Sequence, residues 1–406
     1  ATTSPAVTQP DRTGKVQRAY RMRAYPTAGQ AGRTNRMLRV HCDIYNACLE
    51  ERVKAWRMNR VSISYGTQSA QLRDVREVYP RAAEFSFSAE QRTIRRVDRT
   101  FKAFFARCAR GETPGFPRFK SWRRFDTVDH TAGDGAKWTP TEGRWARAYF
   151  QGVGHLKVSE HTPVAGTVKQ LSLIRDGRKW FVVVVATDEP DPLSETGHSI
   201  GVDVGINRFL TTSDGEVVAN PRFAATAADE LADLQRRFNA SGKRSKNLRR
   251  KIRKLHRKTK NQRLDFHHQV ARRLVNDHDV IAVEDLTVKN MSKRAKPKPK
   301  PDPDNPGAFL PNGGAAKTGL NRSIADVGWA QFRTILTAKA ENAGRTVIAV
   351  NPAYTSIDCH RCGARCTRPE TPTVICPACG PMDADLNGAR NILTRAGTGS
   401  HLNLAA

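Results

Sequence analysis

Hydrophobic side chains recur at two different periods along the first half of this 406-residue chain. In residues 15–25 they alternate roughly with basic residues, as in a strand with one exposed face. In residues 30–59 they recur every three to four positions, which predicts one or two amphipathic helices. Residues 146–158 and 168–186 are again strand-rich, and Asp176-Gly177 supplies a hairpin turn within the latter. We expect these strands to close into a small β-barrel.

Two short apolar strands in the second half each carry a carboxylate. Residues 200–205 place Asp203 in the middle of one strand, and Glu284 ends another. A buried strand tolerates a carboxylate only where a metal or another partner compensates its charge. A hairpin follows the first strand at residues 208–218, turned at Asp214-Gly215. An RNase H-like fold needs this pattern, in which the first strand carries an Asp and pairs with an antiparallel neighbour.

Four cysteines near the C-terminus have the spacing of a zinc site. Two Cys-x-x-Cys pairs are separated by thirteen residues, namely Cys359 with Cys362 and Cys376 with Cys379. Two tight turns that supply two thiolates each satisfy tetrahedral zinc, and four thiolates leave no open position for water. We therefore predict one structural Zn²⁺. Cys366 is a fifth thiol nearby, but the two pairs form the better ligand set.

An acidic helix start follows the second cysteine pair, with Asp383 and Asp385 two residues apart. Asp203, Glu284 and Asp385 together could hold two divalent cations about 3.5–4 Å apart, an arrangement that hydrolyses phosphodiesters. Hard oxygen ligands suit Mg²⁺ or Mn²⁺ better than zinc. The residues alone leave Asp383 as a competitor of Asp385 for this role.

The chain carries a formal charge of +29, with 68 Lys and Arg against 39 Asp and Glu. Such an excess repels itself unless a polyanion is the usual partner, although a basic soluble protein is the alternative. Twelve of the twenty-one residues at 243–263 are Lys or Arg, which exceeds what one solvated helix face requires. Residues 115–122 interleave aromatic with cationic side chains. The aromatics could stack on nucleic-acid bases while the cations hold phosphates, or the aromatics could belong to a hydrophobic core. The candidate nucleic-acid contacts are Arg95, Arg99, Lys102, Phe116, Arg118, Lys120, Lys246, Arg250, Lys254 and Arg257, with Tyr45 and Asn46 as candidates for reading a DNA motif.

The longest apolar run, 180–186, is far too short to span a bilayer, and the N-terminus has no apolar signal segment. We expect a cytoplasmic, nucleoid-associated protein with no membrane partner. Alternating prolines after Lys296 favour an extended, mobile segment, which the residues alone predict to be a disordered tether, whereas the family resemblance described next implies a lid over the active site near here.

The order of these motifs resembles the split RuvC domain of the TnpB family, the RNA-guided nucleases of insertion-sequence transposons. The resemblance rests on the strand around Asp203, on Glu284-Asp-Leu, and on the Cys₄ knuckle followed by Asp-x-Asp-x-Asn-x-Ala-x-Asn-Ile. It runs from Tyr20 to Ile392. Compact type V CRISPR effectors are similar.

The resemblance implies a multidomain α+β fold. Its parts are a wedge β-barrel domain with an inserted helical recognition domain, an RNase H-like (RuvC) α/β nuclease domain, and a Cys₄ zinc ribbon before the last RuvC helix. The expected boundaries are a disordered tail 1–14, the wedge 15–26 and 126–190, the recognition domain 27–125, the RuvC parts 196–352 with basic helices 224–278 and a flexible segment 292–319, the ribbon 353–381, the final helix 382–396, and a tail 397–406.

The resemblance also assigns catalysis to Asp203, Glu284 and Asp385, since Asp385 is the Asp two residues before the Asn of the motif. It implies Mg²⁺ or Mn²⁺ at that site, a guide RNA from the transposon end, and double-stranded target DNA cut beside a short adjacent motif. The alternatives are a type V CRISPR effector and a nuclease-dead RNA-guided repressor. A monomer and a homodimer both remain open.

Overall fold

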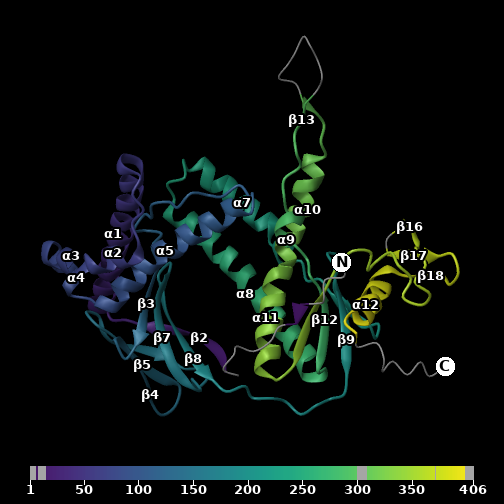
Figure 1. Cartoon of the computed structure of the whole chain (residues 1–406), viewed down its shortest axis with the longest axis horizontal. Helices are drawn as coiled ribbons and strands as arrows, with labels where there is room; N and C mark the ends of the chain where they lie inside the picture. The colour runs from purple at the N-terminus through teal and green to yellow at the C-terminus, as the bar shows by residue number, and fades with distance from the viewer. Residues whose placement is uncertain (1–5, 8–14, 300–308, 371, 398–406) are drawn as a thin grey trace, which may run out of the picture. The chain divides into compact units, whose positions relative to one another are not determined.

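The computed structural model describes residues 6–7, 15–299, 309–370 and 372–397. The chain divides into two compact units, shown in Figure 1. The first, here the barrel unit, comprises residues 15–189. The second, the sheet unit, comprises residues 1–14 and 190–406.

The barrel unit is built on a closed seven-stranded barrel with the strand order β2-β6-β5-β4-β3-β7-β8. Its inward positions alternate with outward ones, as in β8, where every second residue from Trp180 to Ala186 is buried. The barrel expected from the sequence is thus confirmed. The strands are β2 (Val16–Tyr25), β3 (Thr127–Ala132), β4 (Gly135–Pro140), β5 (Trp145–Phe150), β6 (Gly154–Ser159), β7 (Thr167–Asp176) and β8 (Lys179–Asp188).

Five helices follow β2 and precede β3. The first is one continuous helix of 32 residues, which begins at a capping box formed by Thr27 and Gln30. Its buried stripe and that of α5 share one hydrophobic core with the inward-facing side chains of the barrel. The helices are α1 (Ala28–Asn59), α2 (Tyr65–Ala70), α3 (Leu72–Val78), α4 (Pro80–Ala83) and α5 (Phe87–Ala109).

The sheet unit contains a six-stranded sheet with the order β1-β15-β12-β9-β10-β11. β9 is antiparallel to β10 and parallel to β12, and β12 is parallel to β15. The expected antiparallel pairing of the Asp203 strand with the next hairpin is therefore confirmed. The strands are β1 (Ala6–Val7), β9 (Ser199–Val204), β10 (Arg208–Thr212), β11 (Val217–Ala219), β12 (Val280–Glu284) and β15 (Thr346–Val350).

The two faces of this sheet are covered by different helices. Ile200 and Val202 of β9 pack with α8 (Lys246–Asp277) and α11 (Trp329–Asn342) in one core. The alternate residues face α12 (Ala384–Arg395), which lies beside β9 in Figure 1. Because side chains alternate along a strand, the residues on either side of Val202 must face α12. This alternation decides where the carboxylates point.

Several expected elements differ from those observed. The apolar pattern of residues 321–342 predicts one helix, but the structure forms two, α10 (Gly314–Val327) and α11, because Gly328 adopts a left-handed conformation with φ of 71° and interrupts the helix. The basic region is α6 (Phe223–Thr226), α7 (Ala228–Ala240) and α8.

The segment expected to be flexible at 292–319 is partly ordered. Residues 300–308 lie outside the described part of the chain, but β13 (Lys298–Pro299) pairs with β14 (Phe309–Leu310), and α10 already begins at Gly314. α9 (Val288–Met291) precedes it.

The expected disordered tail 1–14 lies outside the described residues except for Ala6–Val7, which pairs with β15 and occupies backbone groups at the sheet edge. The tail from 397 lies outside them beyond Gly397. A small sheet of β16 (Thr367–Glu370), β17 (Thr373–Cys376) and β18 (Gly380–Asp383) precedes α12. In the part of the chain that the structure describes, no helix combines the length and apolar character needed to cross a bilayer.

Candidate active site and metal centre

Asp203 points from β9 toward the first turns of α12. The helix can come this close because position 388 is glycine: a side-chain carbon there would lie 2.8 Å from Asp203 Oδ2. On β9, Gly201 lies two residues before Asp203 and lets the backbone of α12 approach the strand. A side-chain carbon at Gly201 would lie 2.1 Å from Ala389 O. Two glycines thus bring the catalytic candidate on β9 against the helix that carries Asp385.

Glu284 ends β12, the parallel neighbour of β9, and lies on the same face of the sheet as Asp203. The register pairs Val283 with Val202, so the next residue of β12 comes beside Asp203. Burial raises the pKa of Glu284, while a hydrogen bond with the Thr355 hydroxyl lowers it. Asp285 is exposed on the opposite side and forms an ion pair with Arg333 of α11, as strand alternation predicts.

Asp385 lies in the first turn of α12, where Asp383 is the N-cap. The Asp383 side chain accepts hydrogen bonds from the backbone N–H groups of Asp385 and Leu386, both at 3.0 Å. Arg208 Nη1 lies 2.7 Å from Asp383 and 3.4 Å from Asp385. Asp383 is therefore occupied as a cap and ion-pair partner, which agrees with the preference for Asp385 as a metal ligand.

The three carboxylates interact electrostatically. Burial raises the pKa of Asp203 well above its ordinary range, and the negative charges of Glu284 and Asp385 raise it further. The pKa of Asp385 is also raised, by burial and by Asp383. Arg368 in β16 opposes both shifts. Crowded, partly buried carboxylates lower their energy by binding a cation, so the chemistry of this donor set fits Mg²⁺ or Mn²⁺.

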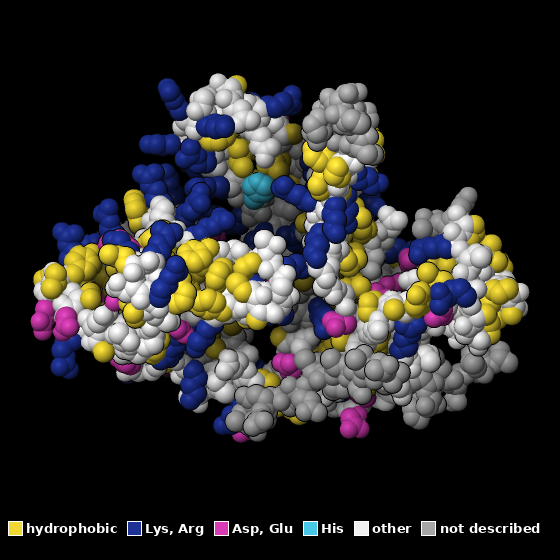
Figure 2. Space-filling view, turned by 45° about the horizontal axis from the view of Figure 1, so that its top comes forward, with side chains coloured by type: hydrophobic (Ala, Val, Ile, Leu, Met, Phe, Trp, Pro, Cys, Tyr) yellow, Lys and Arg dark blue, Asp and Glu magenta, His cyan; other side chains and the backbone are white. Residues whose placement is uncertain are grey.

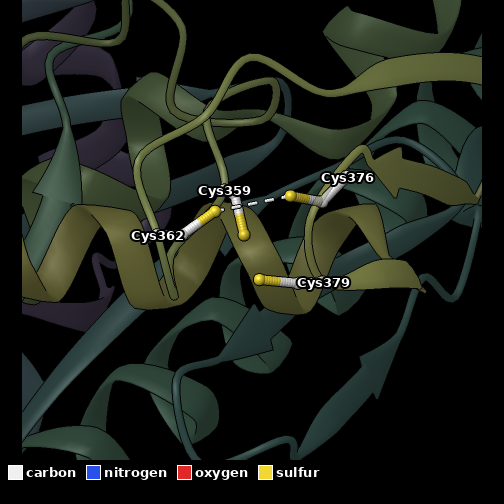
Figure 3. Close-up of side chains that lie close together, drawn as sticks. All are labelled: Cys359, Cys362, Cys376 and Cys379. Carbon is white, nitrogen blue, oxygen red and sulfur yellow. Dashed lines mark hydrogen bonds between the residues drawn. The ribbon is translucent and has the colours of Figure 1, made fainter.

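The four thiols converge on one point. Among the described residues, the Cys359, Cys362, Cys376 and Cys379 sulfurs form the group whose donor atoms all lie within 4.8 Å of one another. Figure 3 shows them pointing toward a common centre, with Cys362 and Cys376 Sγ 3.5 Å apart.

The thiol cluster fits a structural zinc. Hydrogen bonding with Cys362 raises the pKa of Cys379 to about 12, whereas the backbone N–H groups of Ala378 and Cys379 outweigh burial and lower the pKa of Cys376 to about 6. A thiolate stabilised in this way is the form that binds zinc. Cys366 is buried nearby but does not belong to the group of four.

The cysteine turns are fastened to α12 by side-chain amides. Asn387 accepts from His360 N at 2.9 Å and donates to Asp358 O at 2.8 Å, while Asn391 donates to Thr355 O and Asp358 O. His360 lies between the first two cysteines, and its Nε2 is 3.0 Å from Arg390 Nη1. Arginine only donates, so Nε2 accepts and Nδ1 carries the proton that is donated to Asn387. The cysteine turns are thereby linked to the helix that carries Asp385.

The sequence reasoning did not identify Thr355, Arg208, Arg368 or the glycine contacts as parts of this site. Arg208 and Arg368 sit among many other cations, and no spacing pattern distinguishes them. Gly388 had a weak signal, since a small residue one turn after Asp385 permits a close approach.

The nucleic-acid candidates are surface residues for the most part. On α8, Lys246, Arg250 and Lys254 are exposed and follow each other at intervals of four, so they share one face, while Arg257 is half-buried. On α5, Arg95, Arg99 and Lys102 are all exposed; Arg95 lies over the Tyr65 ring, and Lys102 pairs with Asp98 at 3.0 Å. Figure 2 shows Lys and Arg spread widely over the face in view.

The segment at 115–122 combines both interpretations that the sequence left open. Phe116 is half exposed, yet it packs edge-on against Phe101 and Phe104. Arg118 and Lys120 are exposed. The segment therefore presents cations around an aromatic cluster that is only partly accessible.

Tyr45 and Asn46 do not present themselves for reading a DNA motif. Tyr45 is 2% exposed and packs against Phe125. The Asn46 amide exchanges two hydrogen bonds, both of 2.8 Å, with the backbone of Lys120. The position of these residues on α1 suggested a surface role, but tertiary packing turns that side of the helix inward.

Three segments of the chain match known protein families. Residues 182–295 match the OrfB_IS605 family, described as "Probable transposase", and residues 329–392 match the TNB domain of Cas12f1-like proteins. Residues 16–60 match a helix-turn-helix domain of OrfB_IS605. In this chain the last range holds β2 and the single helix α1, so that description does not fit the local structure.

Two relatives match over most of their length. The chain is 29% identical over 404 residues to the "Putative RNA-guided DNA endonuclease" of Streptomyces pristinaespiralis, covering 93% of this chain and 89% of the relative. It is 32% identical over 310 residues to the "Putative RNA-guided DNA endonuclease InsQ" of Escherichia coli (strain K12), and the match covers 75% of this chain and 73% of the relative. A Cas12f1-sgRNA-target DNA complex contains a chain of similar fold, with a TM-score of 0.57 at 14% identity over 93% of this chain and 99% of that one.

Proposed function

Because this chain belongs to the TnpB family, we propose that it is an RNA-guided DNA endonuclease whose RuvC-type site consists of Asp203, Glu284 and Asp385. The observation that carries the proposal is the meeting of three carboxylates from β9, β12 and α12 on one face of the sheet, with the pKa of Asp203 raised by burial and by the charges of the other two. A purely structural role gives no reason to bury carboxylates beside each other.

Each carboxylate has a distinct role in this proposal. Asp203, which interacts with both other carboxylates, would be a ligand of both cations, while Glu284 would hold one cation and Asp385 the other. Divalent cations held there would supply an activated water as nucleophile and would stabilise the leaving 3′ oxygen. Asp383 and Arg208 fix the first turn of α12 and so hold Asp385 in place.

Exposed cations outside the carboxylate site bind the guide RNA, and the guide RNA selects the DNA target. A guide RNA derived from the transposon end contacts exposed cations such as Lys246, Arg250 and Arg118, and its pairing with DNA selects the target. Cleavage takes place next to a short transposon-adjacent motif. The thiol cluster holds a structural zinc.

A nuclease-dead RNA-guided repressor is the second candidate. It needs none of the three carboxylates, so their joint burial favours the nuclease. A compact CRISPR effector uses the same chemistry and differs in chromosomal neighbourhood, where a spacer array replaces a transposon end.

The test begins with expression of the protein beside its native flanking DNA, followed by sequencing of the RNA that co-purifies. We expect one discrete RNA with a constant scaffold and an end that reads into flanking sequence. That RNA, reprogrammed to a plasmid target, should direct cleavage in Mg²⁺ by the wild type. Random host RNA together with guide-independent cutting would instead indicate an unguided nuclease.

A further inference from the structure

Thr355 occupies a buried position between two of the carboxylate-bearing elements. It lies in the loop after β15, four residues before Cys359, and is 1% exposed. Its hydroxyl donates to Glu284 Oε1 and lies 3.0 Å from Pro352 O. Its carbonyl accepts a 2.8 Å hydrogen bond from Asn391 Nδ2 of α12. The residue therefore touches both the end of β12 and the helix that carries Asp385.

We propose that Thr355 is a positioning residue that orients the Glu284 carboxylate toward a divalent cation. This inference rests on the proposed function, in which Glu284 is a metal ligand. A glutamate reaches its ligand position through three rotatable bonds, and each freely rotating bond costs entropy on binding. The Thr355 hydrogen bond fixes one carboxylate oxygen, so that Oε2 remains for the cation. Groups that hold metal ligands in this way typically contribute about 10- to 100-fold to metal affinity or activity.

The position of the hydroxyl is itself determined by the surroundings. Asn391 holds the Thr355 carbonyl and, at 2.6 Å, the Asp358 carbonyl that precedes Cys359. The loop is thus fastened to α12 at two points, and Pro352 O, 3.0 Å from the hydroxyl, is a second acceptor for the proton that Thr355 donates to Glu284. Thr355 couples the orientation of Glu284 to the seating of α12 and hence to Asp385.

Two substitutions separate orientation from packing. Thr355→Val keeps the branched shape but removes the hydroxyl, whereas Thr355→Ser keeps the hydroxyl and removes only the methyl group. If the residue merely fills space, Ser should be at least as damaging as Val. If the hydroxyl orients Glu284, Ser should retain function and Val should not.

The first measurement is the Mg²⁺ dependence of single-turnover cleavage by the full chain with its guide RNA. We expect Thr355→Val to raise the half-saturating Mg²⁺ concentration by about 10- to 100-fold, with much of the rate recovered at high Mg²⁺. Thr355→Ser should stay within about threefold of wild type, because the hydrogen bond is kept.

The second measurement does not depend on cleavage. Mn²⁺ binding to the RNA-free full chain is followed by loss of the free-ion electron paramagnetic resonance signal, with Glu284→Gln as the reference for a lost ligand. Thr355→Val should weaken Mn²⁺ binding in the direction of Glu284→Gln while zinc content and Tm stay near wild type. Wild-type Mg²⁺ and Mn²⁺ dependence in Thr355→Val, or equal damage by Val and Ser, would overturn the role of Thr355 and leave the proposed nuclease standing. Mn²⁺ binding that is insensitive to Glu284→Gln would overturn both.

Discussion

Gly201→Ala should reduce cleavage although residue 201 is not a ligand of any proposed ion. Gly201 precedes Asp203 by two positions on the face of β9 that meets α12. An alanine Cβ there would lie 2.1 Å from Ala389 O and 2.9 Å from Leu393 Cβ. Gly201 is in a regular strand without a positive φ, so alanine fits the local backbone and the effect of the change is steric.

The size of the effect follows from the contact distances. A carbon and a carbonyl oxygen need about 3.3 Å between them, so α12 must retreat by about 1 Å. The clash is with a helix backbone atom, which no rotamer change can relieve. Overpacking of this kind costs about 1–3 kcal/mol, against a gain of about 0.5–1 kcal/mol for replacing a strand glycine. Since α12 carries Asp385, a displacement of about 1 Å should slow cleavage about 100-fold.

The assay is single-turnover plasmid cleavage by the guide-loaded protein, together with Tm and zinc content. Gly32→Ala is the matched control, because Gly32 is exposed within α1 and no atom lies within 4 Å of an added Cβ. It should leave cleavage unchanged and Tm equal or slightly higher. Full cleavage by Gly201→Ala with normal Tm would refute the close seating of α12 on β9. Loss of zinc and of RNA binding would indicate global misfolding instead of a displaced helix.

Three further predictions address the cation site, the zinc and the buried histidines. Asp203→Asn should retain guide RNA and target binding but lower cleavage in Mg²⁺ by several orders of magnitude; cutting near the wild-type rate would remove Asp203 from the site. Cys376→Ser should reduce bound zinc from about one per chain and lower Tm, since zinc binding contributes to folding; metal analysis of the purified wild type that finds no zinc would contradict this. Burial lowers the pKa of both His41 and His130 to about 3, so the unfolded chain takes up protons below about pH 6.5 while the folded one does not. Each histidine should therefore reduce the free energy of unfolding by about 2 kcal/mol between pH 7.5 and pH 5. His130→Phe should make the free energy of unfolding, measured by chemical denaturation, fall less steeply as the pH is lowered. An unchanged dependence on pH would assign the acid sensitivity to other groups.

The sequence alone carried much of the architecture. Strand alternation predicted the barrel, and the two Cys-x-x-Cys pairs predicted the four thiols that converge. These features are local, because period-two alternation and the geometry of a short turn are properties of a few consecutive residues. The division at Gly328 was missed because the apolar pattern continues across it and a glycine is compatible with either outcome.

Tertiary structure alone decided which residues meet. Thr355 reaches Glu284 across 71 positions, Gly388 makes room for Asp203, and Tyr45 turns into the core. A hydrophobic pattern states that one face of an element is buried but not what lies against it. The contacts that orient the carboxylates depend on how closely β9, β12 and α12 approach one another, and that distance is fixed by packing between segments far apart in the chain.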